Sequence, residues 1–306
     1  MAEPNREAIS FKLSFEYPSL AGNAKSTIAD AGLLPAPTPV IHADAGRYRL
    51  RLAQNAHDRE AACRLRFRVF NIELGEGLES SYETGLDIDR FDTVCDHLLV
   101  EDKQSRRVVG TYRMQSGATA AQHLGYYSGQ EFNLAPYELL RPGILELGRA
   151  SIDRDHRTPE VLMLLWRGIA QYAHNMGLRY LLGCSSLNSN DPAEGWQMYR
   201  QLENFRVPLE FETSPTAAYA CPVEPQVGAA QPASSAFDPP FAQSAAAPSR
   251  PVKVPKLLKT YLAIGARIAA PPAWDREFRT IDFLTLLDLN SLSAAARNRF
   301  LAPLSP

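Results

Sequence analysis

The stretch that decides the fold is "ILELGRASIDRDHRTPEVLMLLWRG", residues 144–168. Its first part is a strand-like run that carries Glu146 and Arg149 three positions apart. A helix follows, because Thr158 is a typical N-cap and Pro159 suits the first helical position. Between the two, the glycines that phosphate-binding loops need are missing. A strand that leads directly into a capped helix predicts an α/β unit whose ligand is not a nucleotide.

Composition limits the classes of protein to which this chain can belong. Its 306 residues are 45% hydrophobic and 22% charged, the balance of a globular chain with one large domain or two small ones. A formal net charge of -2 gives no global basic field, so we expect no nucleic-acid partner. Four scattered cysteines without a C-x-x-C pair argue against a zinc cluster or a disulfide framework, and we expect no metal. They favour a reducing compartment, which we take to be the cytoplasm.

Targeting signals are the next feature. The N-terminal "MAEPNREAIS" lacks the basic and apolar regions of a signal peptide. No uncharged apolar run approaches the ~20 residues that cross a bilayer. We therefore expect a protein that does not span a membrane, although it can touch one.

Residues 1–46 have no lasting hydrophobic period and predict a largely irregular tail. One domain is expected over 47–301, interrupted at about 222–252 by a flexible Pro/Ala/Ser-rich insertion. A strand is predicted at 47–53, and the helix after it should turn one stripe of side chains toward the core. The members of that stripe are Ala62, Leu65, Val69 and Ile72.

Further elements alternate along the chain. Strands are predicted at 97–102 and 107–115, and the helix that starts at Thr158 should stop at Gly177. Its stripe of Val161, Leu165, Trp166 and Ile169 would pack on a sheet. A strand at "YLLGCSS" then precedes a helix that begins at Asp191 and Pro192. After the insertion, "PKLLKTYLAIGARI" predicts a helix and "FRTIDFLTLLDL" a strand. This order predicts a mixed α/β layer fold.

The strand at the start of 144–168 should be bulged. Side chains alternate along a regular strand, so Glu146 and Arg149 would point to opposite faces. A bulge at Gly148 shifts the phase by one residue and brings both to the same side. It also separates the strand from its neighbour and leaves backbone groups that an extended ligand can bond, such as a pantetheine arm with its two amides.

These features resemble the fourth strand and following helix of the GNAT superfamily of N-acyltransferases. Members of that superfamily that use acyl-CoA carry a glycine-rich loop, Q/R-x-x-G-x-G/A, where this chain has "DRDHRTPEV". Without a close backbone approach at the helix N-terminus, the grip on the pyrophosphate of CoA should be poorer. The expected donor is therefore the acyl-4'-phosphopantetheine arm of acyl carrier protein, and no cofactor is expected to stay bound.

Four motifs extend the resemblance to the acyl-homoserine lactone synthases and to their relatives, the ornithine N-acyltransferases, also labelled hemolysin-like. Their order along the chain is more specific than any one of them, and the resemblance covers roughly residues 47–222 and 252–301. Lactone synthases have a tryptophan where this chain has Glu76, which argues against S-adenosylmethionine as a substrate. The motifs are "LRFRVF" with Arg66, "DRFD" with Asp89 and Asp92, "VVGTYRM" with Arg113, and "ELGR" with Glu146 and Arg149.

The resemblance implies a GNAT-like mixed central sheet flanked by helices and a site for amine acylation. An amine acceptor arrives largely as ammonium and must lose a proton before it attacks a thioester, so Glu146 is the candidate base. The oxyanion would be stabilised by a backbone N–H of the separated strand. The expected substrate-binding residues are Arg66, Arg113 and Arg149 for a carboxylate or phosphodiester, and Asp89 and Asp92 for a cationic acceptor such as ornithine.

Structural alternatives stay open for each of these residues. Glu146 is equally compatible with a salt-bridged strand carboxylate. The three arginines also suit surface charges of a helix or strand, and Asp89 and Asp92 suit turn formers.

The function implied is transfer of a long, 3-hydroxylated acyl chain from acyl carrier protein to the α-amino group of ornithine, which gives lyso-ornithine lipid. Such an enzyme would work in the cytoplasm, in peripheral contact with the inner membrane. A basic run near the last helix suits docking of acidic acyl carrier protein, although such runs are more often solvated faces. Its residues are Lys253, Lys256, Lys259 and Arg267.

Two other functions are compatible with the sequence. One keeps the fold and changes the acceptor, as in an N-acyl amino acid synthase or an acyl-homoserine lactone synthase. The other is a non-enzymatic, membrane-active hemolysin-like protein, for which the last helix is the candidate lytic surface.

Overall fold

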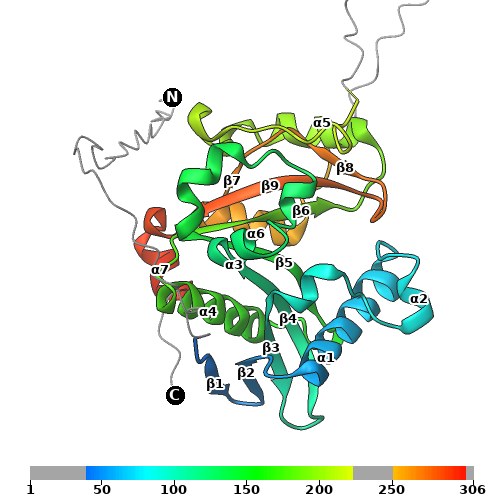
Figure 1. The fold of residues 1–306 in the computed structure, drawn as a ribbon, viewed down its shortest axis with the longest axis vertical. Coiled ribbons are helices and arrows are strands. Elements are labelled where there is room, and N and C mark those ends of the chain that lie inside the picture. Colours follow the sequence, from blue (N-terminus) through cyan, green and yellow to red (C-terminus); the bar gives the residue numbers. More distant parts are fainter. Residues whose placement is uncertain (1–38, 223–250, 301–306) are drawn as a thin grey trace, which may run out of the picture. The chain divides into compact units, whose positions relative to one another are not determined.

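One mixed sheet organises residues 39–222 and 251–300, the part of the chain that this computed structural model describes (Figure 1). Its strands run in the order β1-β2-β3-β4-β5-β6-β9-β7, and β8 also pairs with β9. Only the β5–β6 pair is parallel among these pairings. The strands are β1 (His42–Ala45), β2 (Tyr48–Leu52), β3 (Asp96–Asp102), β4 (Arg107–Ser116), β5 (Ile144–Ile152), β6 (Tyr180–Leu187), β7 (Arg267–Ile268), β8 (Ala273–Asp275) and β9 (Thr280–Asp288).

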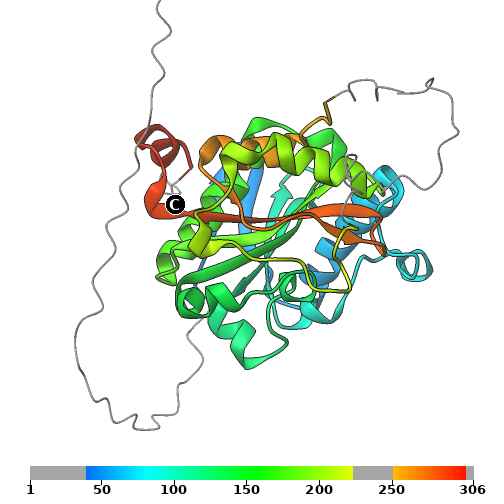
Figure 2. The same ribbon diagram turned by 90° about the horizontal axis from the view of Figure 1, so that it is seen from above.

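Helices lie on both sides of this sheet (Figure 2), as the predicted mixed α/β fold requires. The longest, α4, begins at its N-cap Thr158, whose hydroxyl accepts from the Val161 N–H, and ends at Gly177 with φ +66. The helices are α1 (Ala56–Phe67), α2 (Ser81–Thr84), α3 (Gly117–Gln122), α4 (Pro159–Asn175), α5 (Pro192–Gln201), α6 (Lys256–Ile264) and α7 (Ala294–Phe300). None of the helices in the described ranges is long and apolar enough to cross a bilayer.

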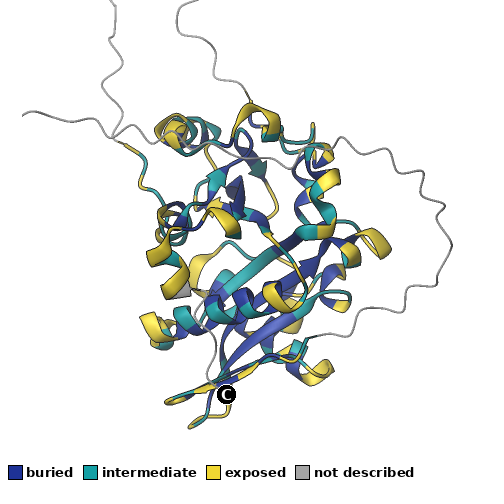
Figure 3. Cartoon of the chain, turned by 90° about the vertical axis from the view of Figure 1, so that its left-hand side faces the viewer, coloured by how far each residue is buried: buried dark blue, intermediate teal, exposed yellow. Residues whose placement is uncertain are grey.

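The core divides along the two faces of the sheet. On one face, α4 packs on β2, β3 and β4, and its predicted stripe of Val161, Leu165, Trp166 and Ile169 is buried there. On the other face, the connection between α3 and β5 covers Leu182 and Leu284 with Phe132 and Tyr137. The buried strands thus lie between half-exposed and exposed helices (Figure 3). The predicted strand and helix order is confirmed.

One helical prediction is wrong. Ala62, Leu65 and Val69 are buried as expected, but Ile72 is 62% exposed. The cause is a change of helix type, because Arg68–Leu74 continues α1 as a π-helix that ends at Gly75 with φ +70. A turn with more residues places each later side chain less far round the axis than a 3.6-residue period predicts. Ile72 therefore faces solvent.

The predicted bulge exists, but it lies one residue later than expected. Gly148 pairs regularly with Arg113, and the extra residues are Arg149 and Ala150, which together face Tyr112. Arg149 has φ +50, a left-handed conformation that costs free energy in a residue with a side chain. The bulge nevertheless has the predicted effect, since Glu146 and Arg149 both line one cavity.

The predicted separation of strands is also present. The parallel β5–β6 ladder ends at the pair Glu146↔Leu182, although both strands continue beyond it. At this point the Leu147 carbonyl lies so close to Gly183 that a Cβ there would be 2.2 Å from the carbonyl oxygen. Only glycine allows this approach without movement of a backbone.

The domain limits are partly outside the described residues. Strand β1 lies within the last residues of the predicted tail 1–46. The described residues, 39–222 and 251–300, belong to one compact unit, and residues 1–38 lie outside the described part. The predicted insertion at about 222–252 falls almost wholly on residues that are not described.

Gly183→Ala tests this geometry. The new methyl group must push β5 away from β6, because the atom it meets is backbone. We expect the free energy of unfolding in urea to fall by about 1–3 kcal/mol. Gly143→Ala is the control, since its nearest neighbour would be at 3.7 Å, an ordinary contact. Equal stability of the two variants would contradict the close approach.

Candidate active site

A cavity of about 280 Å³ opens where β5 and β6 part. On one face of the sheet it is lined by Glu146, which shares that face with Leu182, its last partner on β6. On the other face it is lined by Tyr112, Trp166 and Tyr261, which belong to the core around α4. The cavity therefore passes through the sheet and has a polar end and an apolar end.

Glu146 is held by the loop that precedes β5. Its Oε2 accepts from the Tyr127 N–H at 2.8 Å, and its Oε1 accepts from the Ser128 N–H at 2.8 Å and from the Ser128 hydroxyl at 2.5 Å. The residue is only 5% exposed. A carboxylate has about four acceptor sites, so one site on Oε2 stays available for a ligand.

Burial raises the pKa of Glu146, and the hydrogen bonds from Ser128 and Tyr127 oppose that rise. A carboxyl group with a raised pKa is a stronger base once it is ionised, and it lies beside a cavity rather than in bulk solvent.

Arg66 serves the fold. Its side chain is fully buried, and it forms a fork with Asp92 at 2.7 and 2.8 Å and donates from Nε to Asp87 at 2.9 Å. It does not line the cavity. The prediction that Arg66 contacts a substrate is therefore wrong for this structure, because its donors are used inside the protein.

Asp89 and Asp92 also have internal partners. Together they form a capping box, in which Asp89 caps the turn Arg90–Thr93 and Asp92 accepts from the Asp89 N–H at 2.8 Å. Asp92 binds Arg66, and Asp89 binds Arg113 at 2.7 Å. Burial raises the pKa of Asp92, but Arg66 and Arg113 outweigh it and hold that pKa far below its usual range. Neither aspartate lines the cavity, so they act as turn formers and ion-pair partners rather than as a cation site.

Arg113 and Arg149 do reach the cavity. The Arg149 guanidinium lies 5.0 Å from the centre of the Tyr127 ring and 4.3 Å from that of Phe278. Its Nη2 donates to Asp89 at 3.3 Å, and its Nε forms a longer ion pair of 3.6 Å with Asp87. The two aspartates hold the Arg149 guanidinium at the edge of the cavity, where it can attract a substrate carboxylate.

Sequence analysis missed several residues of the site. Tyr127 and Ser128 lie in a loop without any motif, and two of their three hydrogen bonds to Glu146 come from backbone N–H groups that any residue supplies. Glu76 was noted only as a replacement for tryptophan. It lines the cavity, and burial, together with Asp282, raises its pKa to about 7.

A wide groove of about 1930 Å³ lies next to the cavity, between the start of α4 and helices α5 and α6. Lys253, Lys256 and Lys259 line it, whereas Arg267 does not. Arg267 instead donates to the Asn204 carbonyl. Cavity and groove adjoin each other, because they share eight lining residues: Phe70, Leu74, Glu76, Tyr112, Ala150, Ser186, Pro255 and Leu257.

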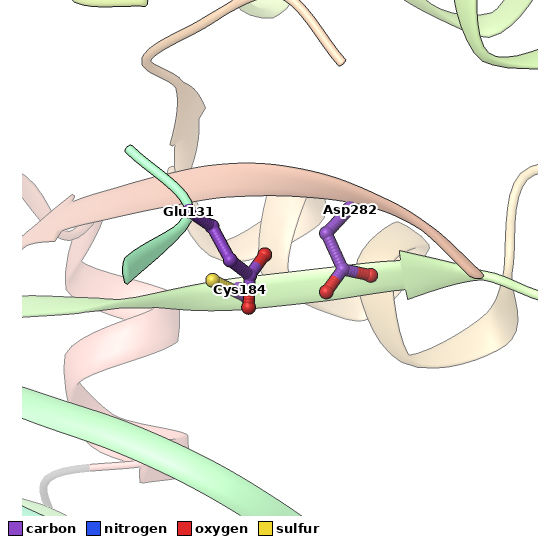
Figure 4. A group of neighbouring side chains, drawn as sticks. All are labelled: Glu131, Cys184 and Asp282. Atoms are coloured by element: carbon purple, nitrogen blue, oxygen red, sulfur yellow. The ribbon is translucent and has the colours of Figure 1, made fainter. Parts of the chain in front are cut away.

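The described residues include one group that could hold a metal ion: Glu131, Cys184 and Asp282, whose ligand atoms lie within 4.8 Å of one another (Figure 4). Their burial and the nearby carboxylates raise the pKa of the Cys184 thiol well above its usual value. A protonated thiol is a poor metal ligand.

Comparison with known proteins now defines the family. Residues 65–167 match the family described as acetyltransferase (GNAT) domain. Over 273 residues the chain is 31% identical to L-ornithine N(alpha)-acyltransferase of Rhizobium meliloti (strain 1021), an alignment that covers 83% of this chain and 87% of that protein. The chain belongs to the L-ornithine N(alpha)-acyltransferase family. Its fold is GNAT-like, as predicted.

Other members of this family are also similar. The chain is 30% identical to the protein of the same name from Agrobacterium fabrum (strain C58 / ATCC 33970), over 81% of this chain and 83% of that protein. Similarity to the Brucella abortus (strain 2308) protein is higher, 37%, but covers 48% of this chain and 56% of that protein.

Solved structures with a related arrangement are more distant. The acyl-homoserine lactone synthase LasI has 12% identity and a TM-score of 0.45 over 86% of this chain and 98% of its own. FeeM, an N-acyl amino acid synthase from uncultured soil microbes, has 12% identity and a TM-score of 0.46 over 84% of this chain and 97% of its own.

Arg66→Met tests whether the buried ion pairs of this family member serve the fold. The change leaves Asp87 and Asp92 buried without their main cation. We expect the free energy of unfolding in urea to fall by about 3–5 kcal/mol. The control is Arg64→Met, which removes an exposed ion pair with Glu60. This variant should change the free energy of unfolding by less than about 0.5 kcal/mol. A loss in Arg66→Met no larger than in the control would show that Arg66 is not structural.

Proposed function

We propose that this protein transfers a long, 3-hydroxylated acyl chain from acyl carrier protein to the α-amino group of ornithine, with lyso-ornithine lipid as the product. The observation that carries this proposal is the end of the β5–β6 ladder at Glu146, beside a cavity that adjoins the groove. A thioester arm that enters by the groove can place its carbonyl at the gap, where Glu146 has an acceptor site to spare.

The chemistry needs one base and one oxyanion site. The substrate ammonium group gives a proton to Glu146, directly or through water, and the free amine attacks the thioester carbon. The C–N bond forms, the oxyanion is bonded by a backbone N–H that β5 or β6 no longer uses in the ladder, and the C–S bond breaks. The pantetheine thiolate takes up a proton as the nitrogen loses its second one.

Ornithine as acceptor is supported by the names of the curated relatives. Arg149 suits its α-carboxylate, because it is a cation that lines the cavity. The flat rings of Tyr127 and Phe278 fix the plane of the guanidinium. Arg113 lies beside it and is held by Asp89.

Acyl carrier protein as donor is supported by the form of the groove. The segment before α4, residues 153–158, reaches the helix without a glycine-rich turn, so it offers a poor grip for a pyrophosphate. Lys253, Lys256 and Lys259 add positive charge to the groove, and acyl carrier protein is acidic. No permanently bound cofactor is needed, because the acyl-4'-phosphopantetheine arm brings the thioester.

Peripheral membrane contact fits a lipid product made in the cytoplasm. Leu139 is 93% exposed and Leu209 is 83% exposed, and they lie on two short 3-10 turns that pack together. Two exposed leucines on one surface suit shallow contact with a lipid interface.

The test is acylation by the purified protein, with 3-hydroxyacyl carrier protein as donor and a panel of amino acids as acceptors. We expect N-acylornithine by mass spectrometry, and a fall in kcat of about 100- to 10,000-fold for Glu146→Gln. Activity that is independent of ornithine would reject the acceptor. Transfer to other amino acids alone would favour an N-acyl amino acid synthase.

Ser128→Ala serves as the control for the role of Glu146. The Ser128 hydroxyl lowers the pKa of Glu146, so its removal raises that pKa. Because the base must be ionised, the acid limb of the kcat/KM profile should move to higher pH while activity at alkaline pH returns. An unchanged acid limb would separate Glu146 from the proton transfer.

Charge reversal at the groove tests the donor. Lys256→Glu with Lys259→Glu should raise KM for acyl carrier protein at low salt, and the effect should shrink as salt screens the charges. Steady-state kinetics with acyl-pantetheine as donor provide the comparison, since that donor has no protein surface to dock. Equal loss with both donors would reject docking at these lysines.

A further inference from the structure

The polar end of the cavity carries a second group of carboxylates. Cys184, Asp275 and Asp282 line the cavity, and Glu131 lies against Cys184 and Asp282 (Figure 4). Glu131 is 1% exposed, and its carboxylate receives no backbone N–H or cationic donor among the described residues, since its polar neighbours are the Asp282 carboxyl group and the Cys184 thiol. Asp275 and Asp282 are 3% and 5% exposed. A buried carboxylate without a partner is costly, so the site is built for something that donates to it.

No described cation is paired with this group. The ion pairs of the described residues bring Arg66, Arg113 and Arg149 to Asp87, Asp89 and Asp92. Burial raises the pKa of Glu131 well above its usual value, and Asp282 and Asp275 add to the rise. Burial also raises the pKa of Asp282. A bound cation would relieve this mutual repulsion.

The position of the group matches the length of a diamino acid. Glu146 pairs with Leu182, and Cys184 lies two residues further along the same face of β6, which places its Cα roughly 7 Å from the Cα of Leu182 at the usual rise of a strand. The α- and δ-nitrogens of ornithine are separated by five bonds, about 6 Å when extended. The electrostatic environment agrees, since Glu131 and Glu146 both raise the pKa of the Cys184 thiol.

We propose that Asp282 and Asp275, with Glu131 behind them, bind the δ-ammonium group of the acceptor while Glu146 faces its α-amino group. This inference rests on the proposed function and gives the cation a place that Asp89 and Asp92 do not offer. The group makes the enzyme selective for an amino acid with a second amine at this distance.

An ammonium group fits better than a metal ion. Acceptors around an ammonium nitrogen stand about 4.6 Å apart when the hydrogen bonds are about 2.8 Å long and tetrahedral. The ligand atoms of Glu131, Cys184 and Asp282 lie within 4.8 Å of one another, a limit that includes this spacing. A zinc ion bound by Cys184 would require a thiolate, whereas the Cys184 thiol has a raised pKa.

The test compares ornithine with norvaline, which has the same carbon chain and no δ-amine. In the purified full-length protein, kcat/KM should favour ornithine by at least about 100-fold. Asp282→Asn and Glu131→Gln should each reduce this ratio by about 10- to 100-fold, the worth of a charge-assisted hydrogen bond. Glu79→Gln, an exposed glutamate away from the cavity, should leave the ratio unchanged.

Calorimetry keeps this inference separate from the proposed function, because it needs no turnover. Tighter binding of ornithine than of norvaline, lost in Asp282→Asn, supports the subsite even if no acylation is found. Acylation of both amino acids at equal rates overturns the subsite and leaves acyl transfer intact. Two further results together would also overturn the subsite. One is stoichiometric zinc binding that Cys184→Ser abolishes, and the other is an Asp282→Asn variant whose preference for ornithine over norvaline is unchanged.

Discussion

The interruption of the β5–β6 ladder is the constraint on which the rest of the structure depends. Two strands that part inside a sheet leave backbone donors and acceptors without partners in a buried place, which costs free energy unless a ligand or water bonds them. Here the Leu147 carbonyl passes over Gly183, and the bulge at Arg149 and Ala150 then turns β5 away from the ladder. Apart from Gly183, the residues at this gap need little sequence specificity, because backbone atoms make the site.

Two groups of charged side chains surround that gap. One group is neutralised by ion pairs within the protein, and the other is not. Three arginines and three aspartates between α1, β4, β5 and the turn before β3 neutralise one another, which fixes Arg149 despite its left-handed backbone. On the far side, Glu131 and Asp282 have no described cation. Ion pairs within the protein hold side chains in position, whereas buried carboxylates without a cation are suited to binding a cationic ligand.

Sequence predicted most of the fold, because caps and periodicity are local. Thr158, Pro159 and Gly177 mark α4 by themselves. Ile72 was misplaced because the change to a π-helix depends on tertiary packing, and the bulge was predicted one residue early because strand register is set by the partner strand. The motif residues were identified from the sequence, but their roles were not. An arginine can bind either a substrate or an aspartate of the protein, and which of these it binds depends on residues that are far apart in the chain. Glu131 and Asp282 carry no motif and meet only in the folded sheet.

Passage of the cavity through the sheet explains how one small site can serve two unlike substrates. Side chains alternate along a strand, so the face with Glu146 and Asp282 is polar at the gap, while the face with Tyr112, Trp166 and Tyr261 is apolar. In the proposed reaction, the amino acid meets the first face and the acyl chain the second. The thioester carbon then lies between them, at the level where the backbone is free to bond an oxyanion. A fully paired sheet would separate these faces, and the two substrates would have no common point at which to react.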